Sequence, residues 1–238
     1  MKKAIIVGAT SGIGKALATT LIQKDYHVGI AGRRLDALRS MKEQDADRIK
    51  YRQLDVQQVA SIESTCNELV HELGGLDLLI IAAGIGEENR HLDFSIENNV
   101  ITTNIQGFTC VADWGMNYFK AQGQGHLVNI SSIAGIRGNG LAPSYNATKA
   151  YQINYLEGLR LHACKSKASI TVTDIRPGFV NTAMAKGDGL FWVASVEKAA
   201  EQIYAGIKNR KNVVYITKRW RLVGYVLKAI PFSLLKRL

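Results

Sequence analysis

The chain has 238 residues, 47% of them hydrophobic, with 22 glycines and only 3 prolines. This length and composition favour one α/β domain with a large core and exclude a Pro-rich or low-complexity protein. The net charge of +10 is uneven. From residue 208 onward nine residues are basic and none is acidic, so the remainder, with 21 basic and 20 acidic residues, is close to neutral.

The N-terminus and the cysteines indicate a cytoplasmic protein. Met-Lys-Lys leads into only six apolar or small residues, 4–9, which is too few for a secretory signal. No run approaches the roughly 18 apolar residues that a membrane span needs. Cys66, Cys110 and Cys164 are odd in number and widely spaced, so we expect reduced, buried thiols and no metal site.

The first 24 residues predict a strand, a glycine turn and a helix. Residues 3–8 are apolar and β-branched, the turn spans 8–14, and residues 15–24 have helical periodicity. Glycines let a pyrophosphate approach the backbone, and a helix N-terminus offers free N–H groups. The alternative is a glycine turn without a ligand. The residues that we expect to bind a dinucleotide here are Gly8, Thr10, Ser11, Gly12, Ile13 and Gly14.

The end of the second predicted strand, residues 27–31, indicates which dinucleotide is bound. Gly32-Arg33-Arg34 follows that strand, where an acidic residue would hold the adenosine ribose hydroxyls. Arginine instead accommodates a 2′-phosphate. Arg33 and Arg34 therefore predict NADP(H) in preference to NAD(H), unless both merely cap a solvated loop.

Strands and helices alternate along the rest of the chain. Further strands are predicted at 49–54, 77–84, 125–131, 169–175 and 212–216, with helices from 55 to about 73 and at 96–121, 143–167 and 195–209. This alternation predicts a Rossmann-type, doubly wound, mostly parallel seven-stranded sheet with helices on both faces. Ligands are then expected at the carboxyl ends of the strands.

Ser132, Tyr145 and Lys149 are the candidate catalytic residues. The apolar run before Ser132 predicts a strand, and Pro143 suits the first turn of a helix. Tyr145 and Lys149 are one turn apart on that helix, so they share a face. Alone, Tyr145 would be read as a buried tyrosine with a satisfied hydroxyl. A second Tyr-x-x-x-Lys pair, Tyr204/Lys208, has no serine thirteen residues upstream.

Taken together, these elements resemble the compact, single-domain branch of the short-chain dehydrogenase/reductase family over residues 1 to about 216. The resemblance implies a catalytic tetrad of Asn104, Ser132, Tyr145 and Lys149, adenine contacts from Asp55 and Val56, cofactor contacts from Ala83, Gly84, Tyr145 and Lys149, and nicotinamide contacts from Pro177, Gly178, Val180 and Thr182. Four residues at three places depart from the family pattern. Residues 81–84 read Ile-Ala-Ala-Gly instead of Asn-Asn-Ala-Gly, Val7 replaces a threonine, and Ser11 stands where NADPH-preferring relatives often have a basic residue.

The roles expected of the tetrad follow from its chemistry. An ammonium beside a phenol favours the phenolate, so Lys149 would lower the pKa of Tyr145, which is ordinarily about 10. Tyr145 then exchanges a proton with the substrate oxygen, and Ser132 donates a hydrogen bond to the same atom. By resemblance, Lys149 also holds the ribose hydroxyls and Asn104 holds a water that links Lys149 to solvent.

Substrate contacts are expected between Thr182 and Ser195. Leu190, Phe191 and Trp192 make this segment apolar, so together with Ser132 and Tyr145 they predict a small apolar carbonyl or alcohol. The alternative is that these aromatic residues only pack on the helix behind them. We expect a homodimer or homotetramer. A catalytically silent NADP(H)-binding sensor or scaffold is the main rival, although such a protein would typically lack Tyr145 or Lys149.

Residues 217–238 form a basic, amphipathic tail beyond the domain of residues 1–216. Helical placement puts one apolar side at Trp220, Leu222, Val223, Val226, Leu227 and Ile230. The tail could pack on its own domain or a partner subunit, lie as a peripheral contact on the anionic inner face of the membrane, or cover the substrate cleft. No nucleic-acid-binding motif accompanies the charge, so nucleic acid is not an expected partner.

Overall fold

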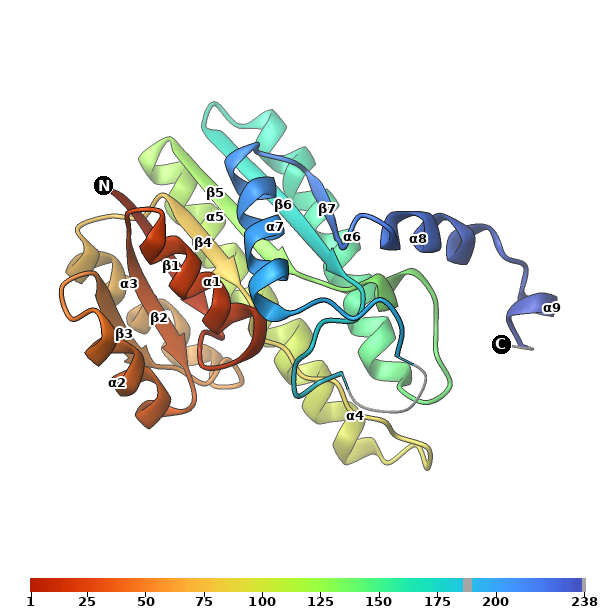
Figure 1. The fold of residues 1–238 in the computed structure, drawn as a ribbon. Coiled ribbons are helices and arrows are strands. Elements are labelled where there is room, and N and C mark those ends of the chain that lie inside the picture. Colours follow the sequence, from red (N-terminus) through yellow and green to blue (C-terminus); the bar gives the residue numbers. More distant parts are fainter. Residues whose placement is uncertain (186–189, 237–238) are drawn as a thin grey trace.

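The computed structural model describes residues 1–185 and 190–236. Its centre is a seven-stranded sheet in the order β3-β2-β1-β4-β5-β6-β7, with every neighbouring pair parallel (Figure 1). This confirms the predicted fold class. The strands are β1 (Lys2–Val7), β2 (Tyr26–Gly32), β3 (Ile49–Gln53), β4 (Leu78–Ile81), β5 (Gln124–Ile130), β6 (Ser169–Pro177) and β7 (Val213–Ile216).

Helices cover both faces of this sheet, because its central strands are apolar on both sides. The helices of the body are α1 (Gly12–Gln23), α2 (Leu35–Gln44), α3 (Ile62–Leu73), α4 (Phe94–Ile101), α5 (Phe108–Gln122), α6 (Pro143–Lys165) and α7 (Val196–Lys208). One core cluster joins the sheet to α1, α2 and α7, and a second joins it to α3, α5 and α6. The helix α2 was not among the predicted elements.

The predicted helix over 96–121 is interrupted. A π-helical turn, Thr102–Gly107, separates α4 from α5 and carries Asn104. Such turns widen a helix by one residue and often occur at functional sites. Gln152 of α6 donates to the backbone carbonyl of Asn104 at 2.8 Å, so the widened turn has a partner on the neighbouring helix.

The C-terminal tail contains α8 (Trp220–Ala229) and α9 (Phe232–Leu235), which lead away from the sheet (Figure 1). No helix of the described chain is long and apolar enough to cross a membrane. The expectation of three buried cysteines is correct for Cys66 only. Cys110 is partly buried and Cys164 is exposed, since it lies on the solvent side of the last turn of α6.

Candidate active site

Ser132, Tyr145 and Lys149 come together where β5 ends and α6 begins. Ser132 follows β5 and caps the short 3₁₀ helix Ile133–Ile136, its hydroxyl accepting from the amide of Ala134 at 3.1 Å. Tyr145 and Lys149 lie on the first two turns of α6, with the Lys149 ammonium 5.9 Å from the centre of the tyrosine ring. The structure thus brings the three predicted side chains to one edge of the sheet.

The ammonium group of Lys149 is almost completely buried. Lys149 as a residue is 4% exposed, and its ammonium donates to the Ile130 carbonyl and to the Gln152 side-chain oxygen, each at 3.0 Å. Burial lowers the pKa of Lys149 to about 8, and the negative charge of Asp174 opposes that shift. With two of its three N–H donors placed, the group has one donor left for a ligand.

Tyr145 is in an environment that favours the neutral phenol. Burial raises the pKa of Tyr145, while the hydroxyl of Ser132, acting on the phenol oxygen, lowers it. The pKa of Tyr145 is therefore raised, contrary to the depression expected from Lys149 alone. A protonated Tyr145 is suited to donate a proton.

Asn104 supports the segment that covers the Tyr145 ring. Its side chain donates to the Ile85 carbonyl at 2.7 Å and accepts from the Ile85 amide at 2.9 Å. The next residue, Gly86, lies so close that a Cβ atom there would be 2.7 Å from the ring of Tyr145. The sequence reasoning missed Ile85 and Gly86, because only the folded chain places them there. That Asn104 holds a water stays a prediction.

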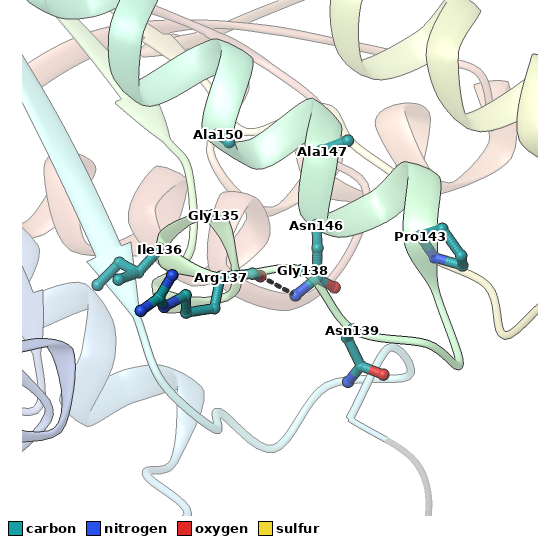
Figure 2. Close-up of a pocket in the computed structure, with 9 residues that line it drawn as sticks. All are labelled: Gly135, Ile136, Arg137, Gly138, Asn139, Pro143, Asn146, Ala147 and Ala150. Atoms are coloured by element: carbon teal, nitrogen blue, oxygen red, sulfur yellow. Dashed lines mark hydrogen bonds between the residues drawn. The ribbon is translucent and has the colours of Figure 1, made fainter. Parts of the chain in front are cut away.

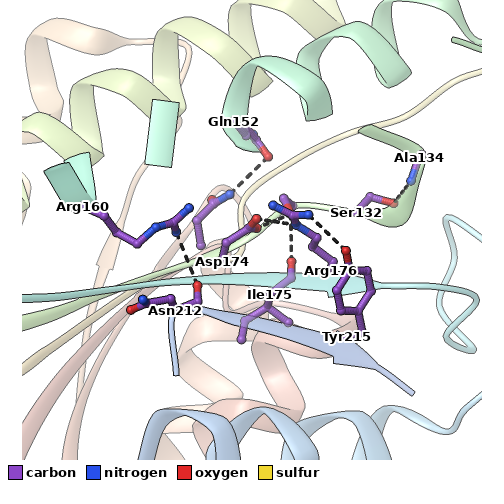
Figure 3. A network of polar contacts seen from close by, with 11 residues as sticks. Ser132, Ala134, Gln152, Arg160, Asp174, Ile175, Arg176, Asn212 and Tyr215 are labelled. Atoms are coloured by element: carbon purple, nitrogen blue, oxygen red, sulfur yellow. Dashed lines mark hydrogen bonds and ion pairs between the residues drawn. The ribbon is translucent and has the colours of Figure 1, made fainter. Parts of the chain in front are cut away.

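A buried ion pair on β6 lies beside the end of β5 (Figure 3). Asp174 on β6 is fully buried and pairs with Arg176 at 2.6 Å. It also accepts from the hydroxyl of Ser131, next to Ser132, while Arg176 donates to the phenol oxygen of Tyr215 at 3.1 Å. The carboxylate thus ties the ends of β5 and β6 together, as a paired buried charge does.

The outer face of α6 fixes the loop after Ser132. Asn146 donates to the carbonyls of Ala134 and Arg137, at 2.9 and 2.8 Å. A pocket of about 350 Å³ lies between this loop and α6 (Figure 2). Its helical lining is Pro143, Asn146, Ala147 and Ala150. These side chains lie on the face of α6 opposite Tyr145 and Lys149, so this pocket is not the candidate catalytic centre.

The glycine turn has the close packing that its residues predict. Gly8 has φ +94°, and a Cβ atom there would lie 2.3 Å from the backbone nitrogen of Ala83. Gly12 has φ +53° and faces the methyl group of Thr182, a residue of the predicted nicotinamide loop. Only glycine adopts these conformations readily. The turn, the end of β4 and the 177–182 loop therefore enclose the N-terminus of α1.

The predicted adenosine side of the site lies beside β2 and β3. Arg34 donates to the Thr10 hydroxyl at 2.9 and 3.2 Å, which joins it to the glycine turn. Arg33 is exposed, and its backbone carbonyl accepts from Gln53 at 2.9 Å. Asp55 lies beyond β3 and accepts from the Gln57 amide, while Val56 is buried. The arginines, the turn and Asp55 share one edge of the sheet.

The end of β4 connects the two parts of the site. The Ala83 amide donates to the Val7 carbonyl at 2.9 Å. A Cβ atom on Gly84 would lie 3.3 Å from the side-chain oxygen of Asn104 and 3.4 Å from the ammonium nitrogen of Lys149. Gly84 thus passes close to the side chains of Asn104 and Lys149, and it has no side chain of its own to separate it from them.

The loop after β6 leads into an aromatic cluster. The Gly178 amide donates to the Ile216 carbonyl, and Val180 forms a β-bridge with Ala194. Beyond the loop, Phe191 and Trp192 are each about half exposed, at 49% and 47%. Leu190 is partly buried, and the predicted segment 186–189 lies outside the described residues. The bridge between Val180 and Ala194 therefore holds the segment with these apolar side chains next to the predicted nicotinamide loop.

Trp220 of the tail completes this cluster. Its ring is 4% exposed, stacks on Phe191 at 5.1 Å and meets Phe179 edge-on at 5.2 Å. It also packs on Gly178, where a Cβ atom would be only 2.0 Å from the indole. The apolar side predicted for the tail helix therefore lies in two different environments. Trp220, Val223 and Leu227 face the domain, whereas Leu222 and Val226 are exposed.

The residues at this edge fit a bound dinucleotide. The glycine turn forms a cradle that Cβ atoms would fill, α1 begins at it, and Lys149 retains a free donor below Gly84. Within residues 1–185 and 190–236, no three His, Cys, Asp or Glu side chains form a group that could hold a metal ion.

Comparisons with known proteins identify the family to which the chain belongs. The profile of the short chain dehydrogenase family matches residues 2–190. An uncharacterized oxidoreductase of Staphylococcus aureus strain MRSA252 is 33% identical over 186 residues, which cover 77% of this chain and 80% of that protein.

Two solved structures of similar fold contain a nicotinamide cofactor. ElxO with NADP bound has a TM-score of 0.80 at 25% sequence identity, and the match covers 90% of this chain and 96% of ElxO. The closed form of serine dehydrogenase complexed with NADP+ has a TM-score of 0.82 at 26% identity, covering 90% and 93%. The profile match and the related sequence establish that this chain belongs to the short chain dehydrogenase family, whose members are NAD(P)-dependent oxidoreductases acting on CH–OH groups.

Proposed function

We propose that this protein is an NADP(H)-dependent oxidoreductase that interconverts a small apolar carbonyl compound and its alcohol, with Tyr145 as the general acid and base. The observation that carries the proposal is the grouping of Tyr145, Lys149 and Ser132 at one strand end, with Lys149 and Ser132 buried, at the same edge of the sheet as the glycine turn. NADP(H) is supported by Arg33 and Arg34 beside the turn and by the NADP present in the two similar structures.

When bound, NADPH supplies the hydride that reaches the carbonyl carbon. Tyr145 donates its phenol proton to the carbonyl oxygen, and its raised pKa keeps that proton available at neutral pH. Ser132 donates a hydrogen bond to the same oxygen as negative charge develops on it. Lys149 then stabilises the phenolate that remains and uses its free donor to hold the ribose.

The substrate class rests on the aromatic cluster beyond the 177–182 loop. Phe191 and Trp192 present half-exposed rings, which pack on each other and on Trp220. Among the described residues, the guanidinium of Arg219 lies 5.6 Å from the centre of the Trp192 ring, where it makes a cation–π contact. Such a surface favours an apolar carbonyl compound over a sugar or a charged acid.

The test is a panel of carbonyl compounds incubated with the protein and NADPH that carries deuterium at the transferable position. Turnover, with one deuterium appearing on the carbinol carbon of an apolar product, is the expected result. A silent sensor or scaffold would bind NADPH in calorimetry and leave every member of the panel unreduced.

We also propose that the tail is a peripheral contact with an anionic membrane surface. Leu222, Tyr225 and Val226 are each more than half exposed, on the side of α8 away from the domain. Phe232 and Leu234 continue this exposed apolar strip. Basic residues surround the strip and no acidic residue follows position 208, so charge complementarity favours anionic lipid.

Sedimentation with vesicles of phosphatidylcholine and phosphatidylserine tests the tail. The protein should pellet at low salt and be released at about 0.5 M salt, where charges are screened. Leu222→Ser/Val226→Ser should lose binding, whereas Leu161→Ser, which changes an exposed leucine of α6, should retain it. Salt-independent binding, or equal binding by both variants, contradicts the proposal. We further expect a homodimer or homotetramer, which light scattering after gel filtration would reveal.

A further inference from the structure

Gln152 lies on the same face of α6 as Tyr145 and Lys149, seven and three residues beyond them. Its side chain is completely buried and makes three contacts. Its oxygen accepts from the Lys149 ammonium at 3.0 Å and from the side-chain amide of Asn129 at 3.2 Å, and its nitrogen donates to the backbone carbonyl of Asn104 at 2.8 Å. Gln152 therefore joins the lysine to the two elements on either side of it.

The orientation of the Gln152 amide is determined by these partners. An ammonium can only donate and a carbonyl can only accept, so the Gln152 oxygen must face Lys149 and its nitrogen must face Asn104. Each contact fixes the other, because rotating the amide would break both. The same side chain therefore sets the position of the Lys149 ammonium relative to the π-helical turn.

We propose that Gln152 is a positioning residue that holds Lys149 in its charged form beneath the cofactor site. This inference rests on the proposed function, since it assigns a second residue to the same proton-transfer group. A carbonyl oxygen that accepts from the ammonium stabilises the charge, which burial otherwise disfavours. The Ile130 carbonyl is the other acceptor, so removing Gln152 halves this support.

The charged groups around Lys149 are few. Tyr145 lies one turn earlier on α6, and Asp174 faces it from β6, already paired with Arg176. The elements β4, β5 and the π-helical turn contribute the uncharged groups Gly84, Ile130 and Asn104. A change at Gln152 is thus expected to alter the protonation of Lys149 before that of any other group.

Two substitutions with opposite consequences test the proposal. Gln152→Met keeps the length of the side chain and removes the acceptor, so the alkaline limit of turnover should move down by about one pH unit, the size expected for a hydrogen bond to a charged group. Gln152→Glu places a carboxylate beside the ammonium and should move that limit up. The matched control, Gln202→Met on α7, should leave it unchanged.

A second readout does not depend on turnover. Without added cofactor, the melting temperature of each protein is measured against pH and compared with that of Lys149→Met, which lacks the titrating ammonium. The pH at which this difference changes should move down in Gln152→Met and up in Gln152→Glu. Equal profiles, or shifts in the same direction, would overturn the role of Gln152. Tyr145→Phe separates the two proposals: if it retains turnover the proposed function fails, and if it is inactive while the Gln152 profiles coincide, only this inference fails.

Discussion

Lys149 and the cations of the tail show two different uses of positive charge in one chain. The ammonium of Lys149 is buried, with acceptors at fixed distances and a pKa lowered to about 8. The basic residues beyond position 217 lie mainly on exposed surface beside an apolar strip. A buried charge acts through its own protonation state, whereas exposed charges act together and are screened by salt. This difference predicts that replacing the buried Lys149 impairs the protein far more than replacing one exposed basic residue of the tail.

The largest expected effect is the loss of Lys149. Lys149→Met should lower turnover by about 10²–10⁴-fold, because the phenolate of Tyr145 loses its neighbouring charge. Lys228→Met on the exposed side of α8 should leave turnover within about twofold. Steady-state kinetics with NADPH and a reducible carbonyl compound measures both. Comparable losses in the two variants would remove the distinction between buried and exposed charge.

The pH dependence of stability between pH 8 and 10.5 should depend on Lys149. Its pKa is about 8 in the folded protein and 10.5 as the ordinary value, so the unfolded chain holds the proton more tightly. The free energy of unfolding is therefore highest above pH 10.5, where Lys149 is neutral in both states. It decreases as the pH falls to 8, because the unfolded chain takes up the proton first. The difference amounts to up to about 3 kcal/mol. Urea unfolding of wild type and Lys149→Met from pH 7 to 10.5 should diverge in this way, and parallel curves would refute it.

Cofactor selectivity should change next. Arg33→Ala should weaken NADPH binding by about 10–100-fold, the size of a charge-assisted contact, and leave NADH binding almost unchanged. Arg34→Ala should have the smaller effect, because Arg34 already donates to Thr10. Calorimetric titration with both cofactors measures this difference. If NADH binding weakens as much as NADPH binding, Arg33 does not recognise the 2′-phosphate.

The smallest effect is expected for stability in the tail. Leu222→Ser/Val226→Ser should change the free energy of unfolding by no more than about 0.5 kcal/mol per site, since both side chains are exposed. The fully buried Leu156→Ala on α6 should cost about 2–5 kcal/mol. Chemical unfolding at constant pH compares them. A large loss in the tail variant would mean that the strip already packs within the protein.

The parallel sheet and the number of its strands could be predicted from the sequence. Apolar β-branched runs such as residues 77–84 mark parallel strands covered on both faces, and their alternation with helices leaves few topologies. The spacing of Ser132, Tyr145 and Lys149 also placed them at one strand end. The local sequence pattern was sufficient for these predictions, because the residues of each strand or helix themselves determine its type.

The contacts between elements could not be predicted in this way. The π-helical turn at Asn104 and the amide of Gln152 depend on how two helices meet, and no local sequence period reports that. The division of the tail has the same origin. Trp220 is buried by Gly178 and Phe191 from distant positions, so helical placement alone cannot show which apolar residues face the domain.

The central claim is that Tyr145 transfers the proton, and Tyr145→Phe tests it most directly. The variant keeps the ring that packs on Gly86 and removes only the hydroxyl, so the fold and NADPH affinity should be retained. Turnover of the best carbonyl substrate should then fall by about 10²–10⁴-fold, the contribution typical of general acid–base catalysis. Turnover equal to that of the wild-type protein, with NADPH binding intact, would contradict the account.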